Sequence, residues 1–348
     1  MDSPGQPKPG KKEQLSRWIH ATGVPRLSLG LPQRSSLLVI NYHRIGDAAA
    51  TPYDSAIFSA TAAEFRAQVE FIARHLRPLS LPQALDWVQD GGASGRWSGC
   101  RTLITFDDGY LDNYDIACPI LSQVGIPAAF FLPTAMVGSS EVPWWDAIAY
   151  IIKNARQRSF TLRYPAERRF DLEGEGPPAT IRNVLNLYKE PVMLDADRFI
   201  NELEVACRSQ RPSTDPANRL FVNWDEVRRM VKGGMAVGSH SHSHRLLGRL
   251  SEQEQLAEMV RARALLREQA GVEADTIAYP VGLRNSFTEI TKSTALRAGY
   301  RAGFSYYGGV NRRGKVDRYD LRRIGVHSLS IERFSVRVAA AIARTWWP

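Results

Sequence analysis

The stretch TLITFDDGY, Thr102–Tyr110, passes from five apolar or β-branched residues directly into two carboxylates and a glycine. A run of this kind predicts a strand that is buried on both faces, as in parallel sheets. Asp-Gly is also a common turn dipeptide, so a simple turn remains one explanation. Adjacent carboxylates at a buried strand end repel each other, however, unless a cation or hydrogen bonds hold them. The stretch therefore predicts a strand ending at Asp107 and Asp108, with a metal ion as a candidate partner.

Similar apolar runs alternate with amphipathic helical stretches along the chain. The further strand candidates are 35–43, 128–134, 235–241, 276–282 and 300–307. Two of the helical stretches, 61–76 and 251–271, open with a Ser/Thr-x-x-Glu capping box. This alternation predicts an α/β fold with a parallel sheet covered by helices. In such folds the chemistry lies at the carboxyl ends of the strands.

Three of the chain's seven histidines occupy alternate positions in GSHSHSH, Gly238–His244. The spacing alone leaves open whether three, two or none of them bind a metal, because an exposed polar loop has the same appearance. Catalytic zinc commonly takes three protein ligands and leaves one position for water, with histidine and carboxylate among the usual donors. Two of these histidines together with Asp108 would form such a set.

Composition narrows the function classes. The 348 residues are 44% apolar and 23% charged, and no apolar run is long enough to predict a transmembrane helix. The net charge of +9 is spread along the chain without a dense basic run, so we expect no nucleic-acid partner. An anionic membrane surface or an acidic ligand stays open.

Compartment is predicted from two further features. The three cysteines are odd in number and widely spaced, which fits a reducing compartment. The first residues, MDSPGQPKPGKKEQ, contain no apolar segment of the kind that signal peptides carry. We therefore expect a cytoplasmic protein, with peripheral contact at the inner membrane face as an option.

Three motifs, TFDDGY, GSHSHSH and AYPVG, resemble the metal-binding and substrate-groove motifs of polysaccharide deacetylases, the NodB-homology group or carbohydrate esterase family 4. The resemblance extends over about 37–326. INYHRIG, PILSQVGIPAAFFLPT and VPWWDAI resemble the exopolysaccharide-biosynthesis branch. The resemblance implies a deformed (β/α) barrel of about seven strands. It also implies a divalent metal cofactor, for which we expect Zn²⁺ ahead of Co²⁺ or Ni²⁺.

The resemblance also implies roles for individual residues. Asp107 becomes the general base, and Asp108, His240 and His244 become the metal ligands. The implied reaction is hydrolysis of the N-acetyl group of an amino sugar in a polysaccharide, a glycolipid or a lipid- or nucleotide-linked precursor. The substrate groove would involve Tyr110, Tyr279, Pro280, Val281, Trp145 and His242. We expect that replacement of His242 leaves metal binding intact.

Two points depart from a simple family pattern. The general acid could be His43 in NYHRIG or His327 in RIGVHSLSI, and we favour His43. An arginine that often pairs with the catalytic aspartate in the family is replaced by Ala278. Another cation, Arg323 or Arg284, would then have to set the pKa of Asp107.

The predicted organisation has three parts. Residues 1–34 form an N-terminal arm and helix, and 35–330 form the barrel. A polar insertion at about 155–218 is expected to decorate the barrel without a core of its own. Residues 331–348 form an amphipathic helix, ending in two tryptophans, that either closes the barrel or lies on a membrane surface. Two other functions stay open, an inactive carbohydrate-binding relative and a hydrolase of another non-peptide C–N amide bond. The oligomeric state is not predictable from the sequence.

Overall fold

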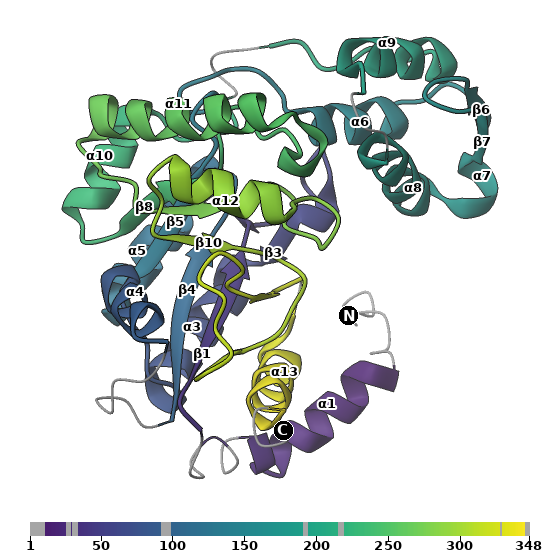
Figure 1. Cartoon of the computed structure of the whole chain (residues 1–348). Helices are drawn as coiled ribbons and strands as arrows, with labels where there is room; N and C mark the ends of the chain where they lie inside the picture. Colours follow the sequence, from purple (N-terminus) through teal and green to yellow (C-terminus); the bar gives the residue numbers. More distant parts are fainter. Residues whose placement is uncertain are drawn as a thin grey trace.

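A curled parallel sheet forms the centre of the molecule (Figure 1). The computed structural model describes residues 11–25, 29, 34–91, 99–190, 194–214, 219–327 and 329–344. Within these ranges, seven strands run parallel. They are β1 (Ser36–Tyr42), β4 (Cys100–Phe106), β5 (Ala128–Leu132), β8 (Ala236–Ser239), β9 (Thr276–Ala278), β10 (Ala302–Phe304) and β12 (Arg323–Gly325). Every residue of β1 and β5 is buried, as expected for strands with apolar side chains on both faces.

The strand order shows how the sheet curls into a barrel. It runs β10-β9-β8-β5-β4-β1, and β12 pairs with the far edge of β1. A parallel bridge between Phe304 and Leu321 then links the end of β10 to the residues before β12. A short antiparallel strand, β11 (Asn311–Arg312), pairs with the first residues of β1. The predicted deformed barrel of about seven strands is confirmed.

Helices cover the outside of the barrel (Figure 1). They are α3 (Ala62–His75), α4 (Leu81–Gln89), α5 (Cys118–Val124), α10 (Trp224–Lys232), α11 (Glu252–Ala270) and α12 (Glu289–Arg297). Thr61 and Ser251 form the capping boxes expected before α3 and α11. Shorter elements connect them: β2 (Arg44–Ile45) paired with β3 (Phe58–Ala60), and the single turns Ser55–Ile57, Asn113–Ala117 and Leu247–Arg249.

The segment expected as a simple decoration has a hydrophobic core, which corrects that expectation. It projects to one side of the barrel at the upper right of Figure 1. Its elements are β6 (Ser159–Leu162), β7 (Arg168–Asp171), α7 (Leu172–Glu175), α8 (Pro177–Lys189) and α9 (Ala196–Cys207). The preceding helix α6 (Trp144–Lys153) packs against α8 and α9 and forms one projecting unit with the segment. Ile148, Val184, Phe199 and Leu203 are fully buried in one cluster there. The segment looks polar in sequence because each element contributes only one apolar face.

The two terminal helices pack against each other. These are α1 (Lys11–Ala21) and α13 (Ile331–Ala343), and His20 Nδ1 lies 2.7 Å from Ser335 Oγ between them. Phe334, Val338 and Ile342 of α13 are buried in the main core, so its apolar face closes the barrel. The terminal tryptophans and the N-terminal arm lie outside the described residues. None of the helices in the described parts of the chain is long and apolar enough to cross a membrane.

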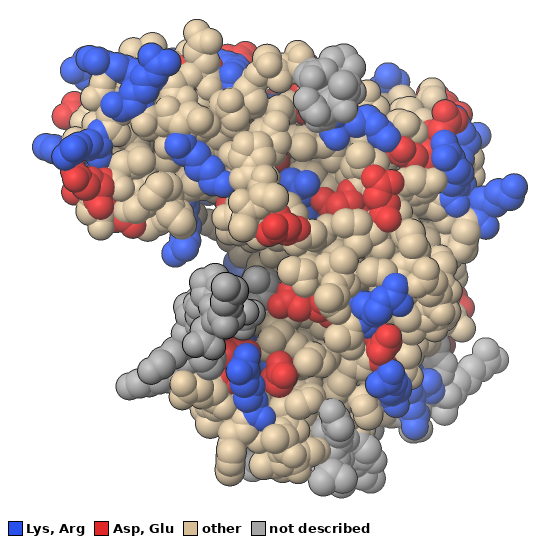
Figure 2. Space-filling view, turned by 180° about the vertical axis from the view of Figure 1, so that it is seen from behind, with Lys and Arg blue, Asp and Glu red and all other residues tan. Residues whose placement is uncertain are grey.

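The surface charges are mixed. On the face seen in Figure 2, Lys and Arg side chains alternate with Asp and Glu rather than forming one basic area. This distribution agrees with the even spread of charge along the sequence.

Candidate active site

The carboxyl ends of four parallel strands of the barrel bring the predicted site residues together. Asp107 and Asp108 follow β4, and His240 and His244 follow β8. His43 follows β1, while His327 follows β12. Asp108 and His244 have φ angles of 73° and 58°, in the left-handed region that residues with a Cβ rarely adopt. Such local strain is tolerated where the surrounding packing holds it, and it concentrates at functional sites.

Three side chains form a candidate metal centre. Asp108 Oδ1 lies 3.4 Å from His240 Nε2 and 3.2 Å from His244 Nε2. All three residues are buried, and their potential ligand atoms lie within 4.8 Å of one another. Two donors on a tetrahedral zinc ion are separated by roughly 3.3 Å, given bonds of about 2.0–2.2 Å. The two separations from Asp108 therefore match the spacing of donors on a zinc-type ion.

The tautomer of His240 supports the same interpretation. Its Nδ1 lies 2.8 Å from the carbonyl oxygen of Ala278, and only a protonated nitrogen can donate there. Its Nε2 faces Asp108 Oδ1 and is the ring nitrogen left to bind a metal. Metal-binding histidines generally use the second ring nitrogen in this way.

Electrostatics favour an ionised Asp108. Burial by itself would raise its pKa, but hydrogen bonds from His240 and His244 hold the pKa well below the ordinary value. Burial lowers the pKa of His244, despite the nearby carboxylate. Burial also opposes the charged form of His240, but the carboxylates of Asp107 and Asp108 raise its pKa. The centre is therefore rich in negative charge that a cation can neutralise.

Arg323 is the cation beside Asp107. Its NH1 and NH2 donate to the two carboxylate oxygens at 2.7 Å each, and Asn41 Nδ2 adds a third hydrogen bond at 3.1 Å. The Arg323 guanidinium is fully buried and also donates to Ser305 O and Asn41 Oδ1. Burial opposes the charge of Asp107, but Arg323 lowers the pKa of this carboxyl below its ordinary value. Arg284, the other candidate, lies over the ring of Tyr307.

These groups face a cavity of about 270 Å³. Its lining consists of His43, Asp54, Ala56, Ile57, Asp107, Asp108, Trp144, Trp145, Leu185, Lys189, His240, His244, Val281, Leu283, Tyr306 and His327. Both candidates for the general acid thus reach the same cavity. Tyr306 lies between them: its hydroxyl is 3.1 Å from His327 Nε2, and its ring is 5.2 Å from that of His43.

Trp145 contacts both the metal centre and the loop after β4. Its ring centroid lies 4.4 Å from that of His244. Its indole Nε1 donates to Tyr110 Oη at 2.7 Å, and that hydroxyl donates to Asp146 Oδ2 at 2.7 Å. The indole N–H is therefore satisfied in a buried position, while the ring faces the cavity.

The remaining groove candidates are distributed differently. Val281 lines the cavity, with a φ angle of 64°. Tyr279 and Pro280 are buried and do not line it, and the Tyr279 hydroxyl donates to Tyr319 O. His242 points elsewhere, with Nδ1 2.9 Å from Thr134 Oγ1. The side chain of Tyr110 is buried, but its backbone N–H has no acceptor among the described residues.

Sequence reasoning missed several residues of the site. Tyr306 lines the cavity, and Asn41, which lies in the INYHRIG motif without an assigned role, donates a hydrogen bond to Asp107. Leu185 and Lys189 come from α8, in the segment that looked like a remote decoration. No local pattern indicates that α8 contacts the cavity, because this depends on how the projecting unit packs against the barrel.

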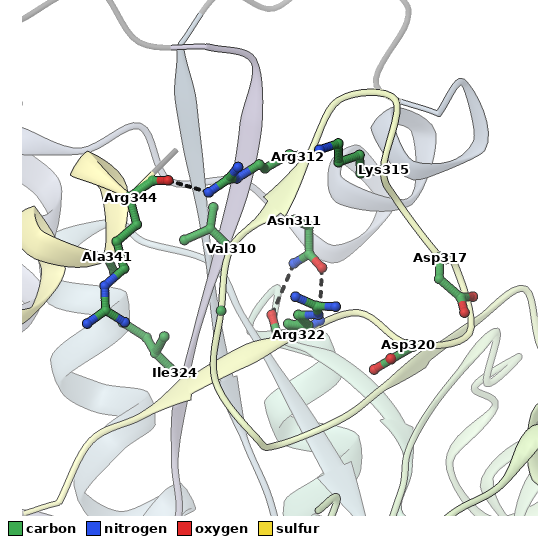
Figure 3. A pocket seen from close by; sticks show the side chains of 11 residues that line it. Val310, Asn311, Arg312, Lys315, Asp317, Asp320, Arg322, Ile324, Ala341 and Arg344 are labelled. Carbon is green, nitrogen blue, oxygen red and sulfur yellow. Dashed lines mark hydrogen bonds between the residues drawn. The ribbon is translucent and has the colours of Figure 1, made fainter. Parts of the chain in front are cut away.

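A second cavity of about 370 Å³ lies beside the start of β1, between the β11 loop and the end of α13 (Figure 3). Arg312 donates to the carbonyl of Arg344, and Asn311 exchanges hydrogen bonds with the backbone of Arg322. Lys315 also lines it. The predicted site residues lie at the opposite ends of the strands.

Comparisons with known proteins find polysaccharide deacetylases. A family model described as polysaccharide deacetylase matches residues 170–303. The putative polysaccharide deacetylase YxkH of Bacillus subtilis (strain 168) is 24% identical over 224 residues, which cover 64% of this chain and 50% of that protein. The chain thus spans about half the length of this curated relative.

Solved structures share the fold. IcaB from Ammonifex degensii superposes with a TM-score of 0.55 and 21% identity, over 89% of this chain and 98% of that one. The Streptococcus pyogenes deacetylase PplD, solved in complex with acetate, gives a TM-score of 0.54 and 16% identity, over 91% and 100% of the two chains. The chain therefore shares the fold of these deacetylases, and its residues 170–303 are similar to the polysaccharide deacetylase family.

Proposed function

We propose that this protein is a metal-dependent hydrolase that removes the N-acetyl group from an amino sugar in a polysaccharide, a glycolipid or a lipid- or nucleotide-linked precursor. One observation carries the proposal. A carboxylate held ionised by a buried arginine, Asp107, shares a cavity with the buried donors Asp108, His240 and His244. The family and the deacetylases of the same fold support this chemistry.

Asp108, His240 and His244 would hold the metal. Two imidazoles and a carboxylate favour Zn²⁺, and the same donors accept Co²⁺ or Ni²⁺. When bound, the ion supplies Lewis-acid polarisation of the acetyl carbonyl and lowers the pKa of water.

Asp107 is the proposed general base. A base must be ionised at working pH and fixed near the water from which it takes a proton. Arg323 provides the first property by lowering the pKa, and the three hydrogen bonds provide the second by fixing both carboxylate oxygens. The unpartnered backbone N–H of Tyr110 is a candidate donor to the oxyanion that forms on the acetyl carbon.

His43 is the better candidate for the general acid that protonates the leaving nitrogen. Burial and the charges of His43 and Arg337 lower the pKa of His327 to about 4, so this imidazole is neutral near pH 7. The charge of His43, by contrast, lowers the pKa of both Asp107 and Asp108. His43 lines the same cavity as both carboxylates.

The test measures acetate release from N-acetylated chito-oligosaccharides and from lipid- and nucleotide-linked N-acetyl sugars, with and without a chelator. Replacing Asp107→Asn should lower kcat by about 100-fold or more because the base is lost, while the protein still binds metal. Asp86→Asn, an exposed change of the same kind on α4, is the matched control and should keep the full rate.

Three outcomes would contradict the proposal. The first is full turnover by Asp107→Asn or by the metal-free protein. The second is ring opening of cyclic amides without acetate release from any sugar, which would favour another C–N hydrolase. The third is sugar binding with no turnover on any substrate, which would favour a carbohydrate-binding protein.

A further inference from the structure

We propose that α6 and α8 form a subsite for a phosphate group carried by the sugar substrate, with Lys189 as its cation. This inference rests on the proposed function, because it names the class of N-acetyl sugar that the cavity accepts. The subsite lies on the wall that the projecting unit contributes, opposite the strand ends of the barrel.

Lys189 is the cation of this wall. It is the last residue of α8, it is half-buried, and it lines the same cavity as Asp107 and Asp108. No residue that the structure describes forms an ion pair or a hydrogen bond with its ammonium group. Its Nζ lies 5.8 Å from the centre of the Trp144 ring, within the range of a cation–π contact.

The acid that faces Lys189 is already engaged. Asp54 also lines the cavity, and its Oδ1 accepts a hydrogen bond from Ala56 N at 2.9 Å. Burial lowers the pKa of Lys189, and the charge of Asp54 offsets this effect only in part. A partly desolvated ammonium without a partner is unfavourable unless an anion reaches it. The ligand would provide this anion.

The surrounding wall is rigid enough to select a ligand. The Trp144 ring stacks on Tyr188 with centroids 4.2 Å apart, and Leu185 lies one helical turn before Lys189. Tyr188 in turn packs edge-on against Phe199 of the unit's own core. These contacts hold the end of α8 that carries Lys189 beside the cavity.

Phosphate is the anion that suits this arrangement. A lysine acts as a point charge toward phosphate, and Trp144 beside it also lines the cavity. Because the subsite and Asp107 share one cavity, the phosphate would belong to the same molecule as the acetyl group. Lipid-linked and nucleotide-linked sugars both carry such a phosphate.

The test compares kcat/KM for N-acetylglucosamine 1-phosphate, UDP-N-acetylglucosamine and a short-chain polyprenyl-diphosphate N-acetylglucosamine with that for neutral N-acetyl oligosaccharides. Lys189→Met should lower the preference for phosphorylated over neutral substrates by about 10- to 100-fold, mainly through KM, because a hydrogen bond to a charged group is lost. Lys315→Met removes the same charge in the distant cavity of Figure 3 and should leave the preference unchanged.

A binding measurement keeps the two proposals separate. Calorimetric titration of the whole protein with N-acetylglucosamine 1-phosphate should show tighter binding than with N-acetylglucosamine, and Lys189→Met should abolish the difference. Equal binding of both sugars, or a preference that survives Lys189→Met, overturns the subsite even if deacetylation occurs. Phosphate-selective binding without acetate release would instead contradict the proposed function alone. The kcat/KM values for the lipid-linked and nucleotide-linked substrates then identify the carrier of the sugar.

Discussion

Arg323 is fully buried, and its guanidinium contacts groups that follow or lie on three different strands. It pairs with Asp107 after β4, Asn41 on β1 and Ser305 after β10. A buried charge is costly unless it is paired and hydrogen-bonded, and here each of the three guanidinium nitrogens donates at least one hydrogen bond. The planar fork of arginine matches both oxygens of a carboxylate, which a lysine ammonium cannot do.

Arg323→Lys therefore keeps the charge but loses the bidentate contact. The pKa of Asp107 should rise toward its ordinary value, and the acidic limb of the pH profile of kcat/KM should move to higher pH by about one unit. Arg284→Lys, which alters an arginine outside the cavity, is the control. If the acidic limb of the pH profile does not move in Arg323→Lys, this arginine does not set the pKa of Asp107.

At the scale of elements, helix α11 holds the loop between the two histidine ligands. The Glu258 carboxylate accepts hydrogen bonds from His242 N at 2.9 Å, Ser243 N at 2.8 Å and Ser243 Oγ at 2.6 Å. The loop must leave β8 with a left-handed residue at Ser241 and another at His244. Glu258 supplies the anchoring that keeps this strained backbone in place.

Glu258→Gln should weaken metal binding by about 10-fold, because charge-assisted hydrogen bonds to the ligand loop are lost. Competition with a chromophoric chelator measures this directly. Glu268→Gln, an exposed change on the same helix, and His242→Ala, whose ring contacts Thr134, should both retain affinity. Unchanged affinity in Glu258→Gln would mean that the loop holds its shape unaided.

At the scale of the whole molecule, Asp146 joins the projecting unit to the barrel. It lies in the first turn of α6, is fully buried, and accepts hydrogen bonds from Tyr110 Oη and Asp54 N. Burial raises the pKa of Asp146 to about 7. The folded protein therefore keeps a proton on this carboxyl between about pH 4 and pH 7, where the unfolded chain loses it.

This difference makes stability fall as pH rises through that window, because the folded state binds more protons. Asp146→Asn keeps an oxygen acceptor but removes the titration. The free energy of unfolding of the parent protein, measured with urea, should fall by on the order of 2 kcal/mol between pH 5 and pH 8. The variant should not show this fall. Parallel pH profiles for the two proteins would contradict the assignment.

The sequence by itself determined the features that depend on neighbouring residues. Apolar runs predicted the barrel strands, capping boxes marked the starts of α3 and α11, and the DDG and HSHSH motifs indicated the donors that meet at the strand ends. These patterns are legible because backbone periodicity and end-capping act over a few residues.

Only the tertiary structure decided which distant groups complete the site. Arg323 is separated from Asp107 by 216 residues, and it was one of two candidate cations until β12 was seen beside β1. The core of the projecting unit, the wall from α8 and the burial of the α13 apolar face likewise depend on packing between elements. Local periodicity shows that an element has an apolar face, but the partner of that face is set by the shape of the whole fold.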